Sequence, residues 1–346
     1  MIAPRMSFLK KLRGPAAVAL ATLLAGCNTV VLNPSGDVAA QQGKLVVVST
    51  LLMLLIVVPV IILALLFAWR YRASNTKATY KPEWDHSTQL ELVIWAAPLL
   101  IIIALGAITW ISTHTLDPYR QLSRIGEKRP IPEGVKPLVV EVVALDWKWL
   151  FIYPEQGIAT VNELAAPVDR PIEFKITASS VMNSFYIPAL AGQIYAMPSM
   201  ETKLHAVINE AGEYEGFSAN YSGKGFSHMR FKFQGVSDAD FNAWVEKVRQ
   251  SSGGQGLDRP GYQALEKPSE NDPVRYYATV APDLYGAILN RCVAAGTMCM
   301  DQMMALDHQR AMGAADANCT PEEAARKSAF ALNTTNATSA TSSAKK

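Results

Sequence analysis

Two long apolar stretches near the N-terminus constrain what this chain can fold into more than any other feature. Residues 45–69 and 92–111 contain no charged side chain, and as helices they would rise about 37 Å and about 30 Å. The hydrocarbon core of a bilayer is about 30 Å thick, so each stretch is long enough to cross it. Pro59 and Pro98 interrupt the stretches, which membrane helices tolerate when neighbouring groups satisfy the freed carbonyls. The sequence therefore predicts a transmembrane hairpin.

The distribution of basic residues predicts the orientation of this hairpin. Arg70, Arg72, Lys77 and Lys81 lie between the two stretches, whereas residues 27–44 before the first stretch contain only Lys44. Cytoplasmic loops carry the excess of Lys and Arg, so we expect the connecting loop in the cytoplasm and both outer flanks outside it.

The first 26 residues have the form of a secretory signal peptide, with basic residues before an apolar run at residues 16–24. The sequence Leu24-Ala25-Gly26-Cys27 places small residues directly before a cysteine and resembles a bacterial lipobox. This predicts Cys27 as the lipidated first residue of the mature chain, processed outside the cytoplasm. An ordinary signal peptide with an incidental cysteine is the alternative.

From residue 137 to about residue 234 the pattern changes to short β-branched, aromatic or alternating segments separated by glycine-rich turns. Examples are residues 138–143, 172–176 and 231–233. Many short strands with turn-rich joints predict a β-sandwich or barrel. Ser237 with Asp240 forms a capping box for a following helix, whose apolar face carries Phe241, Trp244, Val245 and Val248. A second helix is expected at about residues 283–295.

These patterns divide the chain into nine consecutive segments. They are a signal peptide (1–26), a short periplasmic segment (27–44), a first span (45–69), a cytoplasmic loop (70–89), a second span (90–113), a connector (114–136), a β-domain with a closing helix (137–250), a C-terminal helical segment (257–300), and a Met-rich, then low-complexity tail (301–346). We expect the end of that tail to be disordered. The formal net charge of +2, without a dense basic run, excludes a nucleic-acid partner.

Long segments of this chain match a known family. The lipobox, the hairpin, and the segments DWKWLFIYPEQGIATVNE and SSVMNSFYIPAL together resemble subunit II of the haem-copper terminal oxidases, and most closely the bo-type ubiquinol oxidases. The resemblance covers residues 27 to about 296. It implies a cupredoxin-like β-sandwich outside the membrane, haems and copper in a partner catalytic subunit, further small subunits, and a bacterial inner-membrane location.

The resemblance also locates a copper site whose ligands are missing. Relatives that oxidise cytochrome c hold a binuclear copper centre with a first His and the loop Cys-x-Glu-x-Cys-Gly-x-x-His-x-x-Met. On this sequence those positions hold Asn183, Ser218, Asn220, Ser222, Phe226 and Met229. Only the Met is retained, although Gly223 and Gly225 keep their places, which implies a preserved loop shape.

The donor chemistry supports the same conclusion without the family. Copper electron-transfer sites use thiolate and imidazole ligands, and residues 28–291 contain no cysteine. His228 next to Met229 is no substitute, because adjacent residues of an extended segment point to opposite faces. We therefore expect no metal in this chain. Trp147, Trp149 and Tyr153 are interpreted as core and interface residues rather than as an electron path.

The absent copper site predicts the electron donor. A soluble cytochrome needs a relay in the outer domain, whereas quinol dissolves in the bilayer and reaches the catalytic subunit directly. We therefore expect a proton-pumping ubiquinol oxidase subunit without catalytic residues and without a cytochrome c partner. The alternatives are a copper-bearing cytochrome c oxidase subunit II, or a free-standing lipoprotein with a β-sandwich binding domain.

Glu91 is the one ionisable residue of the hairpin with a predicted role. The residues Thr88 to Glu91 fit a capping box, so Glu91 could satisfy orphan N–H groups only. Ionisable residues at the edge of a span are also functional candidates. The resemblance favours the second role, because a Glu at the matching position marks the mouth of a proton channel in the catalytic subunit.

The C-terminal segment leaves two questions open. Cys292 and Cys299 would be about 10.5 Å apart on one helix, too far for a disulfide, but Gly296 could end the helix first. The spacing of Leu284, Ile288 and Cys292 favours a buried apolar role for Cys292. A Met-rich stretch follows, for which we favour an adaptable contact surface or loose tail over Cu(I) capture: Met298, Met300, Met303, Met304, His308, Met312.

Overall fold

The computed structural model describes residues 29–79 and 81–318, and their side chains up to residue 312. Cys27, the predicted signal peptide and the low-complexity end of the chain lie outside the described residues. The chain divides into two compact units after residue 282.

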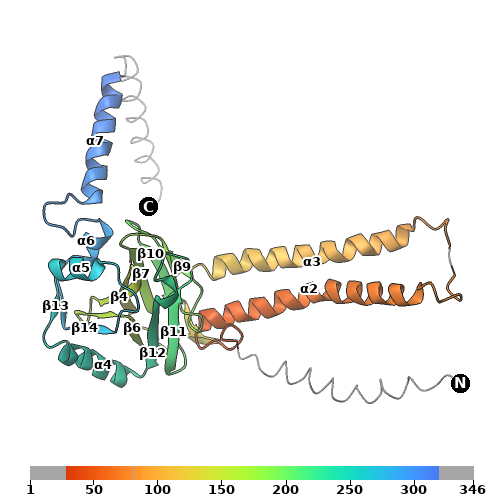
Figure 1. Cartoon of the computed structure of the whole chain (residues 1–346), viewed down its shortest axis with the longest axis horizontal. Coiled ribbons are helices and arrows are strands. Elements are labelled where there is room, and N and C mark those ends of the chain that lie inside the picture. The colour runs from red at the N-terminus through yellow and green to blue at the C-terminus, as the bar shows by residue number, and fades with distance from the viewer. Residues whose placement is uncertain (1–28, 80, 319–346) are drawn as a thin grey trace, which may run out of the picture. The chain divides into compact units, whose positions relative to one another are not determined.

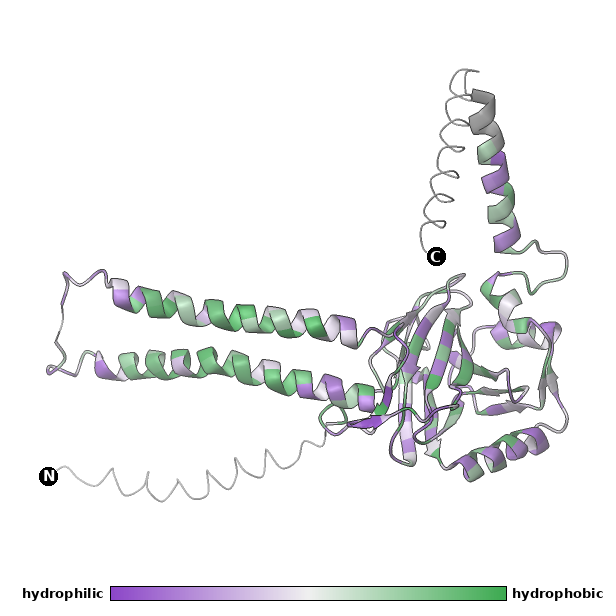
Figure 2. Cartoon of the chain, turned by 180° about the vertical axis from the view of Figure 1, so that it is seen from behind, coloured by the Kyte–Doolittle hydropathy of each residue, from purple (hydrophilic) through white to green (hydrophobic). Residues whose placement is uncertain are grey.

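The predicted hairpin is present as two long helices that run side by side (Figure 1), α2 over Asp37–Arg70 and α3 over Thr88–Thr115. Both are long and apolar enough to cross a membrane. Figure 2 shows apolar residues over most of their length and polar residues towards their ends. Pro59 and Pro98 lie inside the helices without ending them. The first helix is longer than its apolar stretch because α2 begins in the more polar sequence before residue 45.

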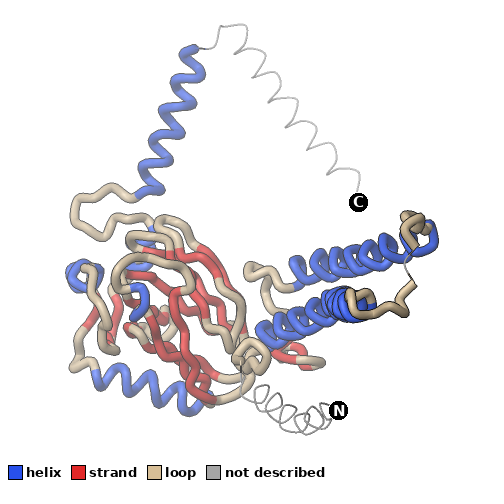
Figure 3. Tube along the Cα trace, turned by 45° about the vertical axis from the view of Figure 1, so that its right-hand side comes forward, coloured by secondary structure: helices blue, strands red, loops and turns tan. Residues whose placement is uncertain are grey.

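The outer domain is a sandwich of two sheets, which Figure 3 shows as two layers of strands. The six-stranded sheet has the order β10-β7-β3-β4-β5-β14. Its strands are β3 Leu138–Leu145, β4 Lys148–Tyr153, β5 Ile158–Val161, β7 Ile172–Ala178, β10 Thr202–Ala206 and β14 Arg275–Tyr277. The five-stranded sheet has the order β6-β12-β11-β8-β9. Its strands are β6 Glu163–Pro167, β8 Asn183–Tyr186, β9 Ile194–Ala196, β11 Gly212–Ser218 and β12 Arg230–Val236. The predicted cupredoxin-like sandwich is confirmed.

An aromatic core joins the two sheets. Leu138, Val140 and Val142 alternate on β3 and are fully buried, as the period of two requires. From the facing sheet, the Phe185 ring packs edge-on against Trp149 at 5.3 Å and stacks on Phe231 at 5.4 Å. Trp149 and Tyr153 are buried core residues, as predicted.

The helix after the sandwich, α4 over Asp238–Ser251, begins as predicted. The Ser237 hydroxyl accepts a hydrogen bond from the Asp240 N–H at 3.1 Å. Phe241, Trp244, Val245 and Val248 are the buried residues of this helix, and α4 contacts β5, β6 and β14. The predicted cap and apolar face are both confirmed.

The segment after α4 is less helical than expected. The helix α5 (Arg259–Glu266) is flanked by β13 (Gly256–Leu257) and β15 (Thr279–Val280), which pair with each other. The strand β14 pairs with β5 and extends the six-stranded sheet. The connector before the sandwich likewise supplies a small hairpin, β1 (Arg124–Gly126) with β2 (Arg129–Pro130).

In the second unit the expected helix at residues 283–295 is shorter, and α6 covers only Leu284–Leu289. The chain then turns, so Cys292 and Cys299 reach a Cα–Cα distance of 4.8 Å and form a disulfide. Cys292 is buried, as its spacing indicated. The helix α7 (Met300–Asn318) follows, so most of the Met-rich stretch is helical rather than a loose tail, and its methionines at 303, 304 and 312 are exposed.

Candidate functional site

The residues at the missing copper positions gather at one end of the five-stranded sheet. Asn183 begins β8 and Ser218 ends β11, and these strands are neighbours. Both side chains are buried, and the Ser218 hydroxyl donates to the Asn183 Oδ1 at 3.0 Å. The N–H of Ser218 donates to the Met229 carbonyl at 3.2 Å and ties the two ends of the loop together.

The loop itself brings the remaining positions close to this pair. The Ser222 hydroxyl lies 4.0 Å from the Sδ of the fully buried Met229. The Asn220 amide donates to the Met182 carbonyl at 3.2 Å, across to the chain that precedes β8. Phe226 begins a 3-10 turn, η1 (Phe226–His228), and its ring lies edge-on to Tyr221 at 5.6 Å.

Trp147 holds the inner side of the loop. Its indole N–H donates to the Ser222 carbonyl at 2.9 Å. A Cβ added at Gly225 would lie 2.6 Å from Trp147 Cδ2, and one at Gly223 would lie 3.0 Å from Cζ2. Gly223 also has φ +114°, which side-chain-bearing residues rarely adopt. The two glycines therefore let the loop lie directly on the indole.

The donor set at these positions does not fit a binuclear copper centre. Asn183, Ser218 and Ser222 offer neutral, hard oxygen atoms, and the only soft donor among the six is the Met229 thioether. Among the described residues, no three His, Cys, Asp or Glu side chains lie close enough to hold a metal ion. Hydrogen bonds and a phenyl ring stand at the positions where the family resemblance implies copper ligands.

The side chains of His228 and Met229 point to opposite sides, as expected, but for a different reason. His228 is exposed and Met229 is fully buried. The segment is a 3-10 turn and not the extended segment assumed from the sequence, so the assumed geometry was wrong although the two side chains do point apart.

In the hairpin, Glu91 lies in the first turn of α3, next to the loop that joins the two helices, and is not part of a capping box. The N-cap of α3 is Ser87 and not Thr88, and it makes no side-chain cap hydrogen bond. The Glu91 carboxylate instead pairs with the His86 imidazole, with 2.7 Å between Oε1 and Nδ1. The other ring nitrogen of His86 lies 3.1 Å from the Thr88 hydroxyl. Glu91 remains half-exposed, so its carboxylate is accessible at the start of the helix.

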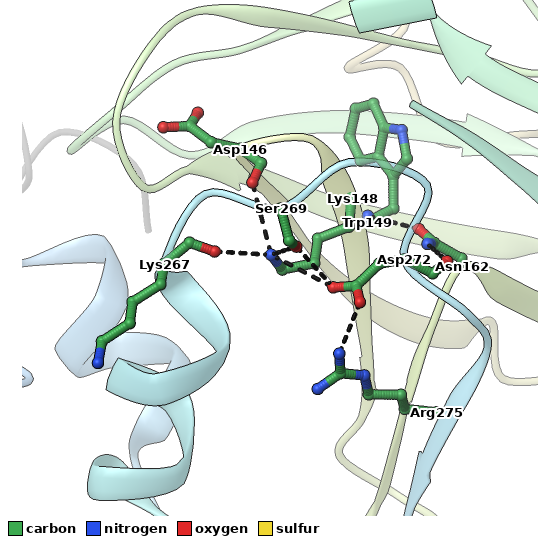
Figure 4. A network of polar contacts seen from close by, with 8 residues as sticks. All are labelled: Asp146, Lys148, Trp149, Asn162, Lys267, Ser269, Asp272 and Arg275. Carbon is green, nitrogen blue, oxygen red and sulfur yellow. Dashed lines mark hydrogen bonds and ion pairs between the residues drawn. The ribbon is translucent and has the colours of Figure 1, made fainter. Parts of the chain in front are cut away.

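Sequence reasoning missed a buried lysine at the start of β4. Figure 4 shows Lys148 Nζ pointing into the loop at residues 267–272, where it donates to the Lys267 carbonyl at 2.9 Å and to the Ser269 hydroxyl. Asp272 Oδ2 lies 3.4 Å away, and the second Asp272 oxygen accepts from Arg275 at 2.6 Å. Burial lowers the pKa of Lys148, and the nearby Asp272 opposes that shift. This network attaches the segment after α5 to the start of β4, an interior strand of the six-stranded sheet.

A second titratable group, Glu141, lies half-buried in the middle of β3. It is in register with Lys175 of β7. Burial raises the pKa of Glu141 to about 7, while the Lys175 charge opposes this and the Glu201 charge adds to it. The alternation of Glu141 with apolar residues predicted a strand. It did not predict that the Glu141 carboxyl would be half-buried.

Comparisons with known proteins agree with this geometry. Residues 155–236 match the model of the cytochrome c oxidase subunit II periplasmic domain, and residues 250–296 match the oxidase aromatic-rich motif. The chain is 54% identical to the cytochrome bo(3) ubiquinol oxidase subunit 2 of Pseudomonas putida, over 78% of this chain and 82% of that one. It is 54% identical to the ubiquinol oxidase subunit 2 of Acetobacter aceti, over 78% and 84%, and 38% identical to the quinol oxidase subunit 2 of Bacillus subtilis, over 78% and 82%.

Among solved structures, the periplasmic domain of cytochrome oxidase subunit II from Bradyrhizobium japonicum aligns with a TM-score of 0.33 and 23% identity, over 35% of this chain and 98% of that one. A chain from a haem-copper terminal oxidase dimer aligns with a TM-score of 0.33 and 16% identity, over 42% and 99%.

Proposed function

The chain belongs to the family of ubiquinol oxidase subunit 2 within the haem-copper oxidases, and we propose that it serves in a proton-pumping quinol oxidase as a subunit without catalytic residues. In the proposed reaction, ubiquinol is oxidised and O₂ is reduced to water. The haems, the active-site copper and the quinol site would belong to a catalytic subunit, together with which this chain and smaller subunits assemble.

The observation that carries this proposal is the donor set of the outer loop. Asn183 and Ser218 hydrogen-bond to each other where copper-bearing relatives need an imidazole and a thiolate. An outer domain without that redox centre cannot receive an electron from a soluble cytochrome. Quinol, which is dissolved in the bilayer, needs no such relay.

The test is purification of the complex through a tag on this chain. We expect a haem-containing partner to co-purify, and the complex to consume O₂ with ubiquinol but not with reduced cytochrome c. Turnover with cytochrome c, or a binuclear copper signal in the spectrum, would favour the copper-bearing alternative. Isolation of the chain without any haem protein would favour the free-standing lipoprotein.

The same loop gives a test of its geometry by restoring the ligands. A variant with Asn183→His, Ser218→Cys, Ser222→Cys and Phe226→His keeps Met229, the two glycines and the Trp147 contact. We expect it to bind copper and become coloured, whereas a variant with the two His substitutions alone should remain colourless because thiolates are required. A full-ligand variant that folds but binds no copper would show that the loop geometry is not preserved.

For membrane placement, we propose two spans in a bacterial inner membrane with the β-domain in the periplasm and a lipid at Cys27. Support comes from the two apolar helices and from the basic loop between them. Mass spectrometry of the mature N-terminus would detect a diacylglyceryl adduct on Cys27, and an unmodified N-terminus elsewhere would exclude it.

Glu91 is the proposed proton-entry residue. Its carboxylate is accessible, stands at the cytoplasmic end of α3 in this topology, and pairs with the His86 imidazole. We expect Glu91→Ala to slow O₂ consumption by roughly tenfold, about 1.4 kcal/mol on the barrier, without loss of assembly. The matched control is Glu83→Ala, an exposed carboxyl in the same loop, and Glu91→Asp should restore part of the rate. Wild-type turnover and an unchanged pH profile in Glu91→Ala would leave Glu91 with a structural role only.

A further inference from the structure

A cavity of about 240 Å³ lies where the hairpin meets the outer domain. Its wall is formed by the first turns of α2, by the chain that leaves α3, and by β10 with the turn before β9. One water needs about 10 to 15 Å³ of such space, so the cavity can hold several waters or a small polar group.

The floor of the cavity is built from buried polar side chains. Asp37, the first residue of α2, is buried and held by two nitrogens of the Arg124 guanidinium, at 2.9 Å and 3.2 Å. The Gln41 amide donates to the same carboxylate at 2.8 Å. His205 of β10 also lines the cavity and is only 7% exposed. Burial lowers the pKa of this imidazole, against the opposing Glu173 charge, so the imidazole is neutral at pH 7 and can donate or accept.

Backbone hydrogen bonds hold the wall in place. The N–H of Gly36 donates to the Ala189 carbonyl at 2.9 Å, and the N–H of His205 donates to the Pro118 carbonyl at 3.1 Å. A Cβ on Gly36 would lie 2.5 Å from the Leu190 carbonyl oxygen, so only glycine permits this approach. The chain on either side of the hairpin is therefore attached to the sandwich, which makes the cavity a defined site.

The rim carries two exposed charges of opposite sign. Within the part of the chain that the structure describes, the Asp117 carboxylate has no cationic partner, and its one hydrogen bond comes from the Tyr119 N–H at 2.9 Å. In the same described residues, the Arg120 guanidinium has no carboxylate partner and makes one long hydrogen bond, 3.4 Å to the His114 carbonyl. With the Asp37–Arg124 pair on the floor, the formal charges of the lining cancel.

The position of the cavity along the helices places it in the headgroup layer of a membrane. Thr115 lies four residues beyond the apolar stretch 92–111 of α3, and Gln41 lies four residues before the apolar stretch 45–69 of α2, which is about 6 Å in each helix. The polar interface on each side of a 30 Å hydrocarbon core is about 5 to 8 Å thick. A cavity at this height opens to lipid headgroups.

We propose that this cavity binds one zwitterionic phospholipid headgroup, with its phosphate at Arg120 and its ammonium at Asp117. An arginine guanidinium recognises phosphate through charge-assisted hydrogen bonds, and an unpaired carboxylate at the rim complements the ammonium. The buried His205 and the partly buried Gln41 add polar groups at the floor. The proposal depends on the membrane placement above and not on the electron donor.

The test uses the full-length chain in its purified, delipidated complex. Native mass spectrometry would follow titration with dioleoyl phosphatidylethanolamine, with dioleoyl phosphatidylglycerol, and with inorganic phosphate. We expect one phosphatidylethanolamine per chain, bound more tightly than the other two. Arg120→Gln should weaken it about tenfold, and Asp117→Asn should remove the preference over phosphatidylglycerol. The matched control is Arg230→Gln, an exposed arginine of the sandwich paired with Glu215, which should change nothing.

Three results would overturn the proposal. Equal lipid retention in Arg120→Gln and Arg230→Gln would show that the rim arginine does not bind phosphate. Tighter binding of phosphatidylglycerol would identify an anionic lipid site, and equally tight binding of inorganic phosphate would identify a simple anion site. A complex that retains the lipid but does not oxidise quinol would contradict the proposed function and leave this inference intact.

Discussion

The hairpin and the sandwich use apolar residues in opposite ways. Along the charge-free parts of α2 and α3 the large apolar side chains are largely exposed, for example Leu65 at 68% and Leu100 at 66%. In the sandwich, Trp149, Phe151 and Phe185 are fully buried. The sandwich therefore carries its own hydrophobic stabilisation, whereas the apolar surface of the hairpin must be covered by lipid or by partner subunits.

The largest expected effect is the difference between matched truncations in the two regions. Phe185 contacts aromatic rings of both sheets, so Phe185→Ala should cost the outer domain about 3 to 5 kcal/mol of unfolding free energy. Leu100→Ala on the exposed face of α3 should leave the unfolding of that domain unchanged. Urea unfolding of the full chain in detergent, followed by near-UV circular dichroism, would measure both. Similar losses of unfolding free energy in the two variants would show that the sandwich does not depend on its buried core more than on the hairpin surface.

A smaller effect is expected from the one lysine that the sandwich buries, a contrast with the hairpin, whose residues 45–69 and 92–111 contain no charged side chain. Lys148→Met removes the hydrogen bonds to the loop at 267–272 and leaves Asp272 with Arg275 as its only charged partner among the described residues. We expect a loss of about 2 to 3 kcal/mol in the same unfolding experiment.

The control for that variant is Lys232→Met, because Lys232 is exposed and its ion pair with Glu213 lies on the surface. Exposed pairs contribute about 0 to 1 kcal/mol. If Lys148→Met were no more costly than Lys232→Met, the buried network would be irrelevant to stability.

The smallest expected effect concerns the half-buried Glu141. Its pKa is raised from 4.5 to about 7 in the folded chain, so the folded state binds more protons than the unfolded state between these values. The unfolding free energy attributable to this group therefore falls as pH rises from 4.5 to 7. Glu141→Gln should match the wild type at pH 4 and exceed it by about 1 to 2 kcal/mol at pH 8, less than the full shift because solvent screens a partly exposed group. A pH-independent difference would assign the effect to packing rather than ionisation.

Several features follow from the sequence because they depend on local chemistry. The two charge-free stretches predict the hairpin by length and composition alone. Alternating strands and the Ser237 cap predict the sandwich and α4, and the missing thiolates exclude a copper relay of the family type. Where local patterns were ambiguous they misled: Thr88 to Glu91 looks like a capping box, but the N-cap is Ser87 and the Glu91 carboxylate pairs with His86.

Contacts between residues far apart in the sequence are visible only in the folded chain. It joins Asn183 to Ser218, seats the loop on Trp147, buries Lys148 against residues 267–272, and places Asp37, Arg124 and His205 around one cavity. Hydropathy and spacing describe residues a few positions apart, whereas Asn183 and Ser218 are 35 positions apart and Lys148 and Ser269 are 121 positions apart. Which distant residues pair depends on how the whole sheets pack. A buried polar group is stabilised only when the fold places its hydrogen-bond partner next to it.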